Sequence, residues 1–333
     1  MSEPTTSSDA YVRKFAFRPF DGTRRGRIYR LWAIAWQWWM HEWKRSKAVK
    51  FLIGFLIFYF VLMNMFLLSV REWMFSMDPD LTTNDLLEDN LLTMVRGIVS
   101  FGVSFFVETG DGASSAEFNF GGTSIFILIL LVMVGSGLIA DDISNQTTEI
   151  YYSKLERHEY VLGKFLAFFI FGNIVLTFPY VFEFFLLAVG LGNIDLISAL
   201  PVLVHVIVFT EIITITYSAI ILAFSSLTNR RLYAGLTTFM LMFTSNMIIS
   251  SLAFSGGSAG YEIFLDVLTL LLLTSYILIG ITEIDYYSFR GLQSINLTDG
   301  VGIESWMIIG VLGLYILLGF LVVIFQVYWR HSK

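Results

Sequence analysis

The sequence predicts an all-α integral membrane protein, and two observations carry that prediction. Of the 333 residues, 56% are hydrophobic and only 14% are charged, whereas a soluble domain carries about a quarter charged residues. Apolar runs recur along the chain, and a helix of about 20 apolar residues is needed to cross about 30 Å of hydrocarbon. The chain is therefore too apolar for water and able to cross a membrane several times.

Six of these runs have the length of a transmembrane helix. The predicted spans are residues 51–70, 123–140, 165–190, 199–224, 232–253 and 303–327. They divide the chain into an N-terminal region (1–50), a transmembrane domain (51–327) and a short C-terminal tail (328–333).

The distribution of basic residues orients the spans. Residues 1–50 hold eleven Lys and Arg, whereas the 71–122 connection holds two of them against nine acids. Basic segments stay on the cytoplasmic side of a membrane, so we expect a multi-pass protein of the cell membrane with a cytoplasmic N-terminus. After six spans the C-terminus is cytoplasmic as well.

A seventh apolar run, residues 263–282, needs a separate interpretation. If it crossed fully, the acidic loop after it would be cytoplasmic and the basic YWRHSK end would be external. Both outcomes oppose the charge rule. We therefore predict a re-entrant hairpin before the last span, with a seven-span topology as the alternative; irregular backbone at a hairpin tip is tolerated where protein or water covers it.

The segment ahead of the first span predicts an amphipathic helix in the cytoplasmic interface. It reads RGRIYRLWAIAWQWWMHEWKRSK, with basic residues at both ends. Tryptophan and basic side chains favour the boundary between hydrocarbon and water. The tryptophans at helical spacing are Trp32, Trp36, Trp39 and Trp43. Simple anchoring to the membrane would also explain them.

The chain lacks the motifs of common enzymes. It contains no GxxxxGK[ST] nucleotide loop, no HExxH, no cysteine, and only four histidines, which are scattered. We therefore predict no catalytic residue, no metal site and no cofactor on this chain. Asp141 and Asp142 could suggest a metal-binding pair of a membrane enzyme, but adjacent carboxylates at a helix start more often act as a cap.

A charged segment, residues 137–164, lies between the second and third predicted spans on the cytoplasmic side. It reads GLIADDISNQTTEIYYSKLERHEYVLGK. Asp141, Asp142 and Ser144 suit a helix N-terminus, and the residues from Thr147 to Ser153 can continue that helix. A rigid helix tied to two spans is suited to transmit force to them from a partner.

This segment resembles the first cytoplasmic loop of ABC-2 type permeases, the membrane subunits of ATP-binding-cassette exporters. The shared pattern is an acidic start, a Thr-Glu-aliphatic-Tyr helix, an arginine, an aromatic residue and a closing Gly-Lys. The matching positions are Asp141, Asp142, Thr148, Glu149, Ile150, Tyr151, Arg157, Tyr160, Gly163 and Lys164. The family usually has a proline where this chain has Lys154. The six spans, the interfacial helix and the hairpin are also similar to that family.

The resemblance implies a permease subunit that docks two ATP-binding subunits and pairs with an identical or different second permease subunit. ATP and Mg²⁺ would bind on the partner ATPase, membrane lipid would surround the spans, and no nucleic acid is expected as a partner. The Trp-rich helix would be the connecting helix beside the ATPase. The implied ATPase-coupling residues are Asp141, Asp142, Thr148, Glu149, Tyr152, Arg157, Gly163 and Lys164. A solvated charge at Glu149 and a basic anchor at Arg157 are the alternatives.

Polar residues inside predicted spans are candidates for a translocation surface, because buried acids in a membrane are costly. Glu211 falls in the middle of a span, and Thr214 and Ser218 follow on roughly the same helix face. Glu183 lies in the outer half of the third span, after Pro179. Interhelical hydrogen bonding alone would also explain them. A different class, an ion-coupled secondary transporter, would use Glu211 and Glu183 as proton carriers, although its usual repeated halves are not evident.

Overall fold

The structure, a computed structural model, confirms a helical membrane protein. Six of the helices that it describes are long and apolar enough to cross a membrane. The described residues are 26–77, 82–99, 105–108, 114–117, 122–152, 155–192, 196–255, 260–279, 285–290, 293–296 and 303–329.

The ends of the spans agree with the predicted ones to within about four residues, except that the third begins at Arg157, well before the predicted start at 165. Several helices extend beyond their spans. The first lies in α3 (Lys47–Met77), and the second runs through α5 (Gly122–Gly135) and α6 (Gly137–Ser144). The third is built from α8 (Arg157–Gly172), the π-helix η1 (Asn173–Thr177) and α9 (Phe178–Leu191). The last three are α10 (Leu196–Leu227), α11 (Arg231–Ser255) and α13 (Ser305–Trp329).

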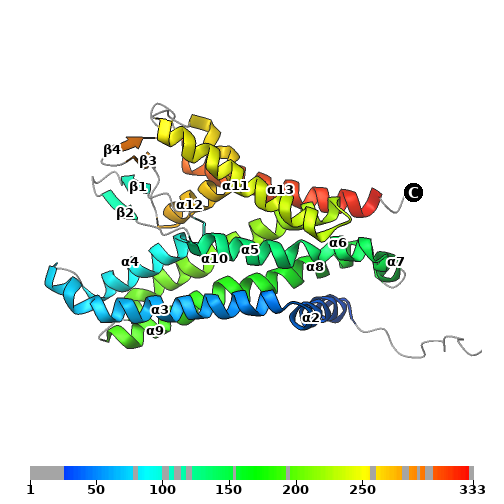
Figure 1. The fold of residues 1–333 in the computed structure, drawn as a ribbon, viewed down its shortest axis with the longest axis horizontal. Coiled ribbons are helices and arrows are strands. Elements are labelled where there is room, and N and C mark those ends of the chain that lie inside the picture. Colours follow the sequence, from blue (N-terminus) through cyan, green and yellow to red (C-terminus); the bar gives the residue numbers. More distant parts are fainter. Residues whose placement is uncertain are drawn as a thin grey trace, which may run out of the picture.

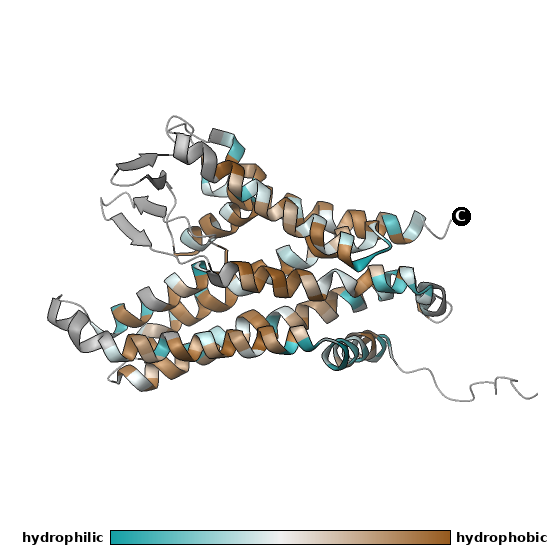
Figure 2. Ribbon diagram, viewed as in Figure 1, coloured by the Kyte–Doolittle hydropathy of each residue, from teal (hydrophilic) through white to brown (hydrophobic). Residues whose placement is uncertain are grey.

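The two ends of the helical bundle differ in kind. The helices α2 (Arg27–Arg45) and α7 (Thr147–Tyr152) lie at one end, together with the last turns of α13 (Figure 1). Four short strands and α12 (Val267–Leu278) lie at the other end. Hydrophobic residues run along the spans, whereas α2 is largely hydrophilic on the side visible in Figure 2. These features match a bundle that crosses a bilayer with α2 across one face of it.

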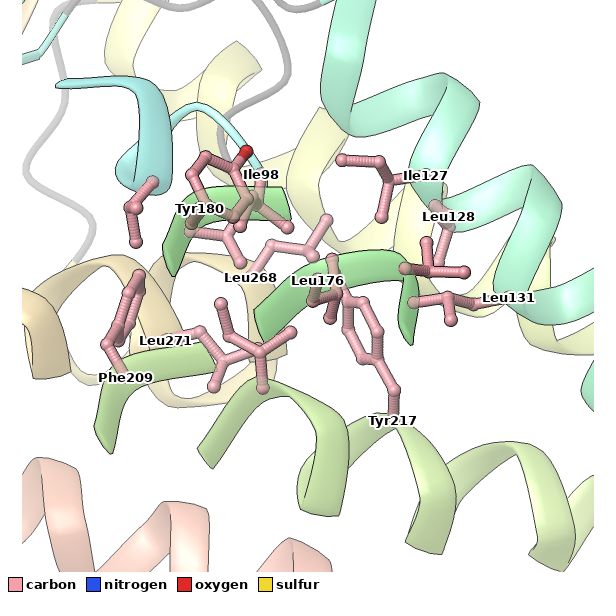
Figure 3. Packing of buried hydrophobic residues seen from close by; sticks show 14 of the residues in the cluster. Ile98, Ile127, Leu128, Leu131, Leu176, Tyr180, Phe209, Tyr217, Leu268 and Leu271 are labelled. Carbon is pink, nitrogen blue, oxygen red and sulfur yellow. The ribbon is translucent and has the colours of Figure 1, made fainter. Parts of the chain in front are cut away.

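The core forms around α10, which contacts α13, α11, α4, α8 and α12. Apolar residues cover all sides of α10, as expected for a helix buried among other helices. Phe209 and Tyr217 are fully buried, and Figure 3 shows them among side chains of η1, α5 and α12, such as Leu176, Leu128 and Leu271. Because α10 contacts several of the other spans, it fixes their positions relative to one another.

The long connection after the first span contains a helix that the sequence analysis did not predict. This helix, α4 (Thr83–Arg96), begins with a capping box in which Thr82 and Asp85 exchange hydrogen bonds. Leu87, Leu91 and Val95 are fully buried on its inner face. The helix packs against α9 and α10, so part of the predicted outer loop belongs to the core.

The same end carries a four-stranded antiparallel sheet, which the all-α prediction also did not include. Its strand order is β2 (Ser114–Glu117), β1 (Phe105–Glu108), β3 (Asp285–Arg290) and β4 (Gln293–Asn296). In the central pair, Phe105 lies opposite Ser288 and Glu108 opposite Asp285. The sheet therefore joins the connection before the second span to the one before the last span.

The apolar run at 263–282 forms a short 3₁₀ helix, η2 (Gly260–Leu265), followed by α12. With 12 residues, α12 is about 18 Å long, too short to span a membrane. Asp266 caps its buried start, accepting hydrogen bonds from the backbone N–H of Leu268 (3.1 Å) and from the Asn246 amide (2.9 Å). Because β3 pairs with β1, the chain leaves this region at the end of the molecule that carries the sheet.

Candidate functional site

The 137–164 segment begins at a break in the second span, between α5 and α6. The break occurs at Ser136, where backbone groups lose their helical partners. The Ser225 hydroxyl, from α10, accepts hydrogen bonds from the N–H groups of Ile139 and Ala140, both at 3.0 Å. It also donates a hydrogen bond of 2.8 Å to the Ser136 carbonyl. One buried serine therefore fixes the direction in which α6 leaves the bundle.

Asp142 joins the three helices that form this segment. Its Oδ2 atom lies 2.6 Å from the Lys164 ammonium of α8 and accepts a 2.8 Å hydrogen bond from the Tyr160 hydroxyl. Its Oδ1 atom accepts a 3.1 Å hydrogen bond from the Thr147 hydroxyl at the start of α7. Lys164 is almost fully buried and lies 5.5 Å from the ring centres of Tyr151 and Tyr160. Asp142 and Lys164, two of the residues predicted for coupling, are thus in direct contact.

The same environment affects Tyr151 of α7. Its side chain is partly covered, and both this burial and the nearby Asp142 carboxylate raise the pKa of the Tyr151 phenol. The phenol therefore stays neutral over the physiological pH range and contributes an uncharged ring to the cluster.

Asp141, the neighbouring carboxylate, contacts α2 and α11 instead. Its Oδ2 atom lies 3.2 Å from the Arg45 guanidinium and 3.7 Å from that of Arg231. Arg231 also forms a 2.5 Å ion pair with the buried Glu42 of α2 and donates to the Met133 carbonyl of α5. Nothing in the sequence indicates that Glu42, Arg45 and Arg231 lie together with Asp141.

The helix α2 lies across α8 at close range. The Arg30 guanidinium lies 2.8 Å from the Glu159 carboxylate, which is 3% exposed. Gly163 is needed at the crossing, because a Cβ atom there would come within 2.9 Å of the Ile34 side chain. The structure therefore gives Gly163 a packing contact with α2.

The four tryptophans of α2 that were predicted to lie at helical spacing, Trp32, Trp36, Trp39 and Trp43, do not lie on one surface. Trp32, Trp36 and Trp43 are exposed, as is suited to a membrane interface. Trp39 instead packs on Phe171 of α8, with ring centres 5.6 Å apart. Three of the rings are available to lipid, and the fourth holds the helix against the bundle.

The helical part of the loop between the second and third spans is shorter than predicted. Asp141 and Asp142 lie inside α6, a continuation of the second span, and do not start the loop helix. A turn at Asn145 and Gln146 follows, with Gln146 at φ 55°, and α7 then spans only Thr147–Tyr152. The predicted helix from Ser144 was wrong at its start, because the turn interrupts it. The side chains of Glu149 and Tyr152 lie outside the described part; Thr148 is partly exposed.

Arg157 starts α8 and faces the end of the last span. Its guanidinium carbon lies 5.2 Å from the centre of the Tyr328 ring of α13. This contact links the return of the loop to the C-terminal helix, a role that the sequence did not indicate.

Glu211 belongs to a polar cluster in the membrane interior. The Asn173 amide donates to one carboxylate oxygen at 3.3 Å, and the Thr177 hydroxyl donates to the other at 3.4 Å. Both donors lie on η1, directly before Pro179. A π-helical turn is often found at functional sites, and proline lacks the N–H of a regular helix. Glu211 itself is partly exposed.

Thr214 and Ser218 are fully buried. Their hydroxyls donate to carbonyls one turn earlier in α10, those of Thr210 and Thr214 respectively. Thr214 also packs so closely on α8 that a Cβ atom at Gly172 would come within 2.4 Å of its methyl group. Neither residue shares the partly exposed position of Glu211 in this structure.

Glu183 lies apart from Glu211, in a contact between α9 and α3. It is 1% exposed, and one of its oxygens accepts a 3.0 Å hydrogen bond from the Asn64 amide. The two acids of the predicted translocation surface therefore have no hydrogen-bond partner in common.

These features define a multi-pass membrane protein in which the loop between the second and third spans is fixed to several spans at once, the class that contains transporter subunits. The family model of the ABC-2 family transporter protein matches residues 32–332. The chain belongs to this family and is an ABC-2 type membrane permease, the membrane component and not the ATPase. Permeases of the family work with ATP-binding subunits. A search of curated proteins finds no match to this chain.

Proposed function

We propose that this permease exports its substrate using ATP hydrolysis by two separate ATP-binding subunits that bind Mg²⁺ and ATP. A second permease subunit, identical or different, completes the transporter. The proposal places it in the cell membrane with both termini in the cytoplasm.

The observation that carries this proposal is the attachment of α7 to the spans. Its first residue, Thr147, bonds to Asp142, which is paired with Lys164 of the third span. The adjacent Asp141 lies 3.7 Å from Arg231 of the fifth span and 3.2 Å from Arg45 of α2. A force on α7 would thus reach three spans and the connecting helix together, which is the mechanical requirement for coupling to an external motor.

The orientation follows from the same end of the molecule. Both α2, with its basic residues, and the end of α13 lie beside α7, and basic segments favour the cytoplasm. The 263–282 region re-enters from the outer side in this proposal. Supporting it are the short α12 and the pairing of β3 with β1.

Glu211 and its donors on η1 are the best candidates for the substrate path. The cluster lies inside the membrane, remains partly open and contacts a π-helical turn, a geometry that can change without breaking a regular helix. Glu149 is the residue of α7 that we expect to contact the ATPase.

The test is co-purification of the ATP-binding subunits and substrate-stimulated ATP hydrolysis in a Glu149→Gln variant. The change removes one negative charge from α7 and so raises the net charge by one unit. Asn229→Lys is the matched control, because it adds one unit at an exposed position of the other loop at this end. We expect weaker ATPase binding or uncoupled hydrolysis only in Glu149→Gln. Transport driven by a proton gradient without ATP would instead support the secondary transporter.

A further inference from the structure

A lipid-facing groove between α3 and the η1–α9 segment is a feature that the proposed function does not use. Its cavity volume is about 290 Å³, and its walls include Ile57, Val61, Phe178 and Phe182. These four side chains are between 47% and 67% exposed, so they form a rim that faces the hydrocarbon. The groove has its own entrance from the membrane.

Two buried polar side chains, Glu183 and Asn64, also line this apolar groove. They are 1% and 3% exposed respectively. The Asn64 amide nitrogen is fully used, because it donates to the Phe60 carbonyl at 2.8 Å and to one Glu183 oxygen at 3.0 Å. The second Glu183 oxygen and the Asn64 side-chain oxygen have no partner. Buried polar atoms without a partner are rare and costly.

Both free atoms are acceptors when Glu183 is ionised, so a complementary ligand supplies N–H or O–H donors. No Lys, Arg or His is among the described residues that line the groove, and an ionised carboxylate in an apolar site needs a cation to pair with it. The aromatic rings of Phe60, Phe178 and Phe182 line the groove as well, and such rings attract cations through their faces. A protonated amine satisfies all three features at once.

We propose that this groove binds a lipophilic amine from the membrane, with its ammonium group on Glu183 and Asn64 and its apolar body along the phenylalanines. Glu183 lies eight residues before the end of α9, or about 12 Å along a helix. The ammonium therefore binds toward the outer half of the bilayer. The site does not depend on which molecule the transporter exports.

The test is saturation binding of radiolabelled dodecylamine to the full chain in phosphatidylcholine nanodiscs, with empty nanodiscs subtracted. Dodecylamine should bind saturably. Dodecyl methyl ether, which has a similar tail but neither charge nor N–H, should fail to compete. Glu183→Gln keeps an acceptor for Asn64 but removes the charge, and it should weaken binding about tenfold or more, since hydrogen bonds to charged groups are the stronger class.

Two further variants separate recognition from folding. Val61→Trp fills the groove from its exposed rim and should also abolish saturable binding. It tests the site independently, so the proposal can still be checked if Glu183→Gln fails to fold. Phe182→Leu should weaken binding, whereas Phe185→Leu, an equally exposed residue of α9 outside the groove, should bind like wild type. Equal binding by wild type, Glu183→Gln and Val61→Trp would overturn the proposal. So would effective competition by the ether, or a disulfide between two Val61→Cys chains, which would place a second copy over the groove.

Discussion

The ion pair between Lys164 and Asp142 is predicted to hold the loop between the second and third spans against α8, and Lys164→Met tests this. Methionine keeps much of the apolar stem but removes the ammonium, which lies 2.6 Å from the carboxylate. The two side chains are only 3% and 15% exposed. Removing one partner of a buried pair costs about 3–5 kcal/mol, because the other charge stays buried and uncompensated.

The loss of unfolding free energy is expected at the lower end of that range, because Asp142 keeps other contacts. Asp142 keeps the hydroxyl donors of Tyr160 and Thr147 and some contact with solvent. We therefore expect Lys164→Met to lower the free energy of unfolding by about 3 kcal/mol. The control is Arg45→Met, since Arg45 is 55% exposed and pairs with Asp141 at 3.2 Å. An exposed pair of this kind is worth less than about 1 kcal/mol.

The assay is equilibrium unfolding of the purified chain in mixed micelles, titrated with a denaturing detergent. Adding Asp142→Asn to Lys164→Met should recover part of the loss, because the unpaired charge is then removed; residues in direct contact couple by about 0.5–3 kcal/mol. The idea that the buried pair fixes the loop would be refuted if Lys164→Met and Arg45→Met had the same small effect on the free energy of unfolding. Strict additivity in the double variant would refute it as well.

Three further predictions concern the membrane domain. Gly172→Val should destabilise the protein by about 1–3 kcal/mol in the same assay, because a side chain there would collide with Thr214; an unchanged unfolding midpoint would disprove this contact. A cysteine at Ser294, in β4, should react with an impermeant maleimide in intact cells, and labelling only after lysis would favour seven spans. Glu211→Leu should fold and assemble while transport falls, whereas loss of assembly would make Glu211 a structural residue.

The number and position of the spans could be predicted from the sequence because each depends on a local property. A run such as residues 303–327 is favourable in hydrocarbon whatever its neighbours are, and the structure has α13 at nearly the same place, Ser305–Trp329. The amphipathic pattern of α2 is equally local. Even so, the pattern did not show that Trp39 turns inward onto Phe171.

The partners of the candidate residues could not be predicted, since they depend on which helices become neighbours. Asp142 and Lys164 were both singled out by the resemblance, yet their contact requires α6 and α8 to lie together. Glu42 and Arg231 are 189 residues apart, and helical periodicity indicates the face of a residue but not the helix opposite. For the same reason the sequence could not show that Thr214 and Ser218 are buried while Glu211 is partly exposed.

The sequence by itself determined the membrane class, the six spans and the 137–164 segment that resembles its family. Only the tertiary structure decided that α4 packs inside the bundle, that β1 pairs with β3, and that Glu183 and Glu211 lie in separate clusters. The physical reason is the range of the interactions. Transfer into hydrocarbon is a sum over consecutive residues, whereas strand pairing, ion pairs and buried hydrogen bonds join residues that the chain brings together only when it folds.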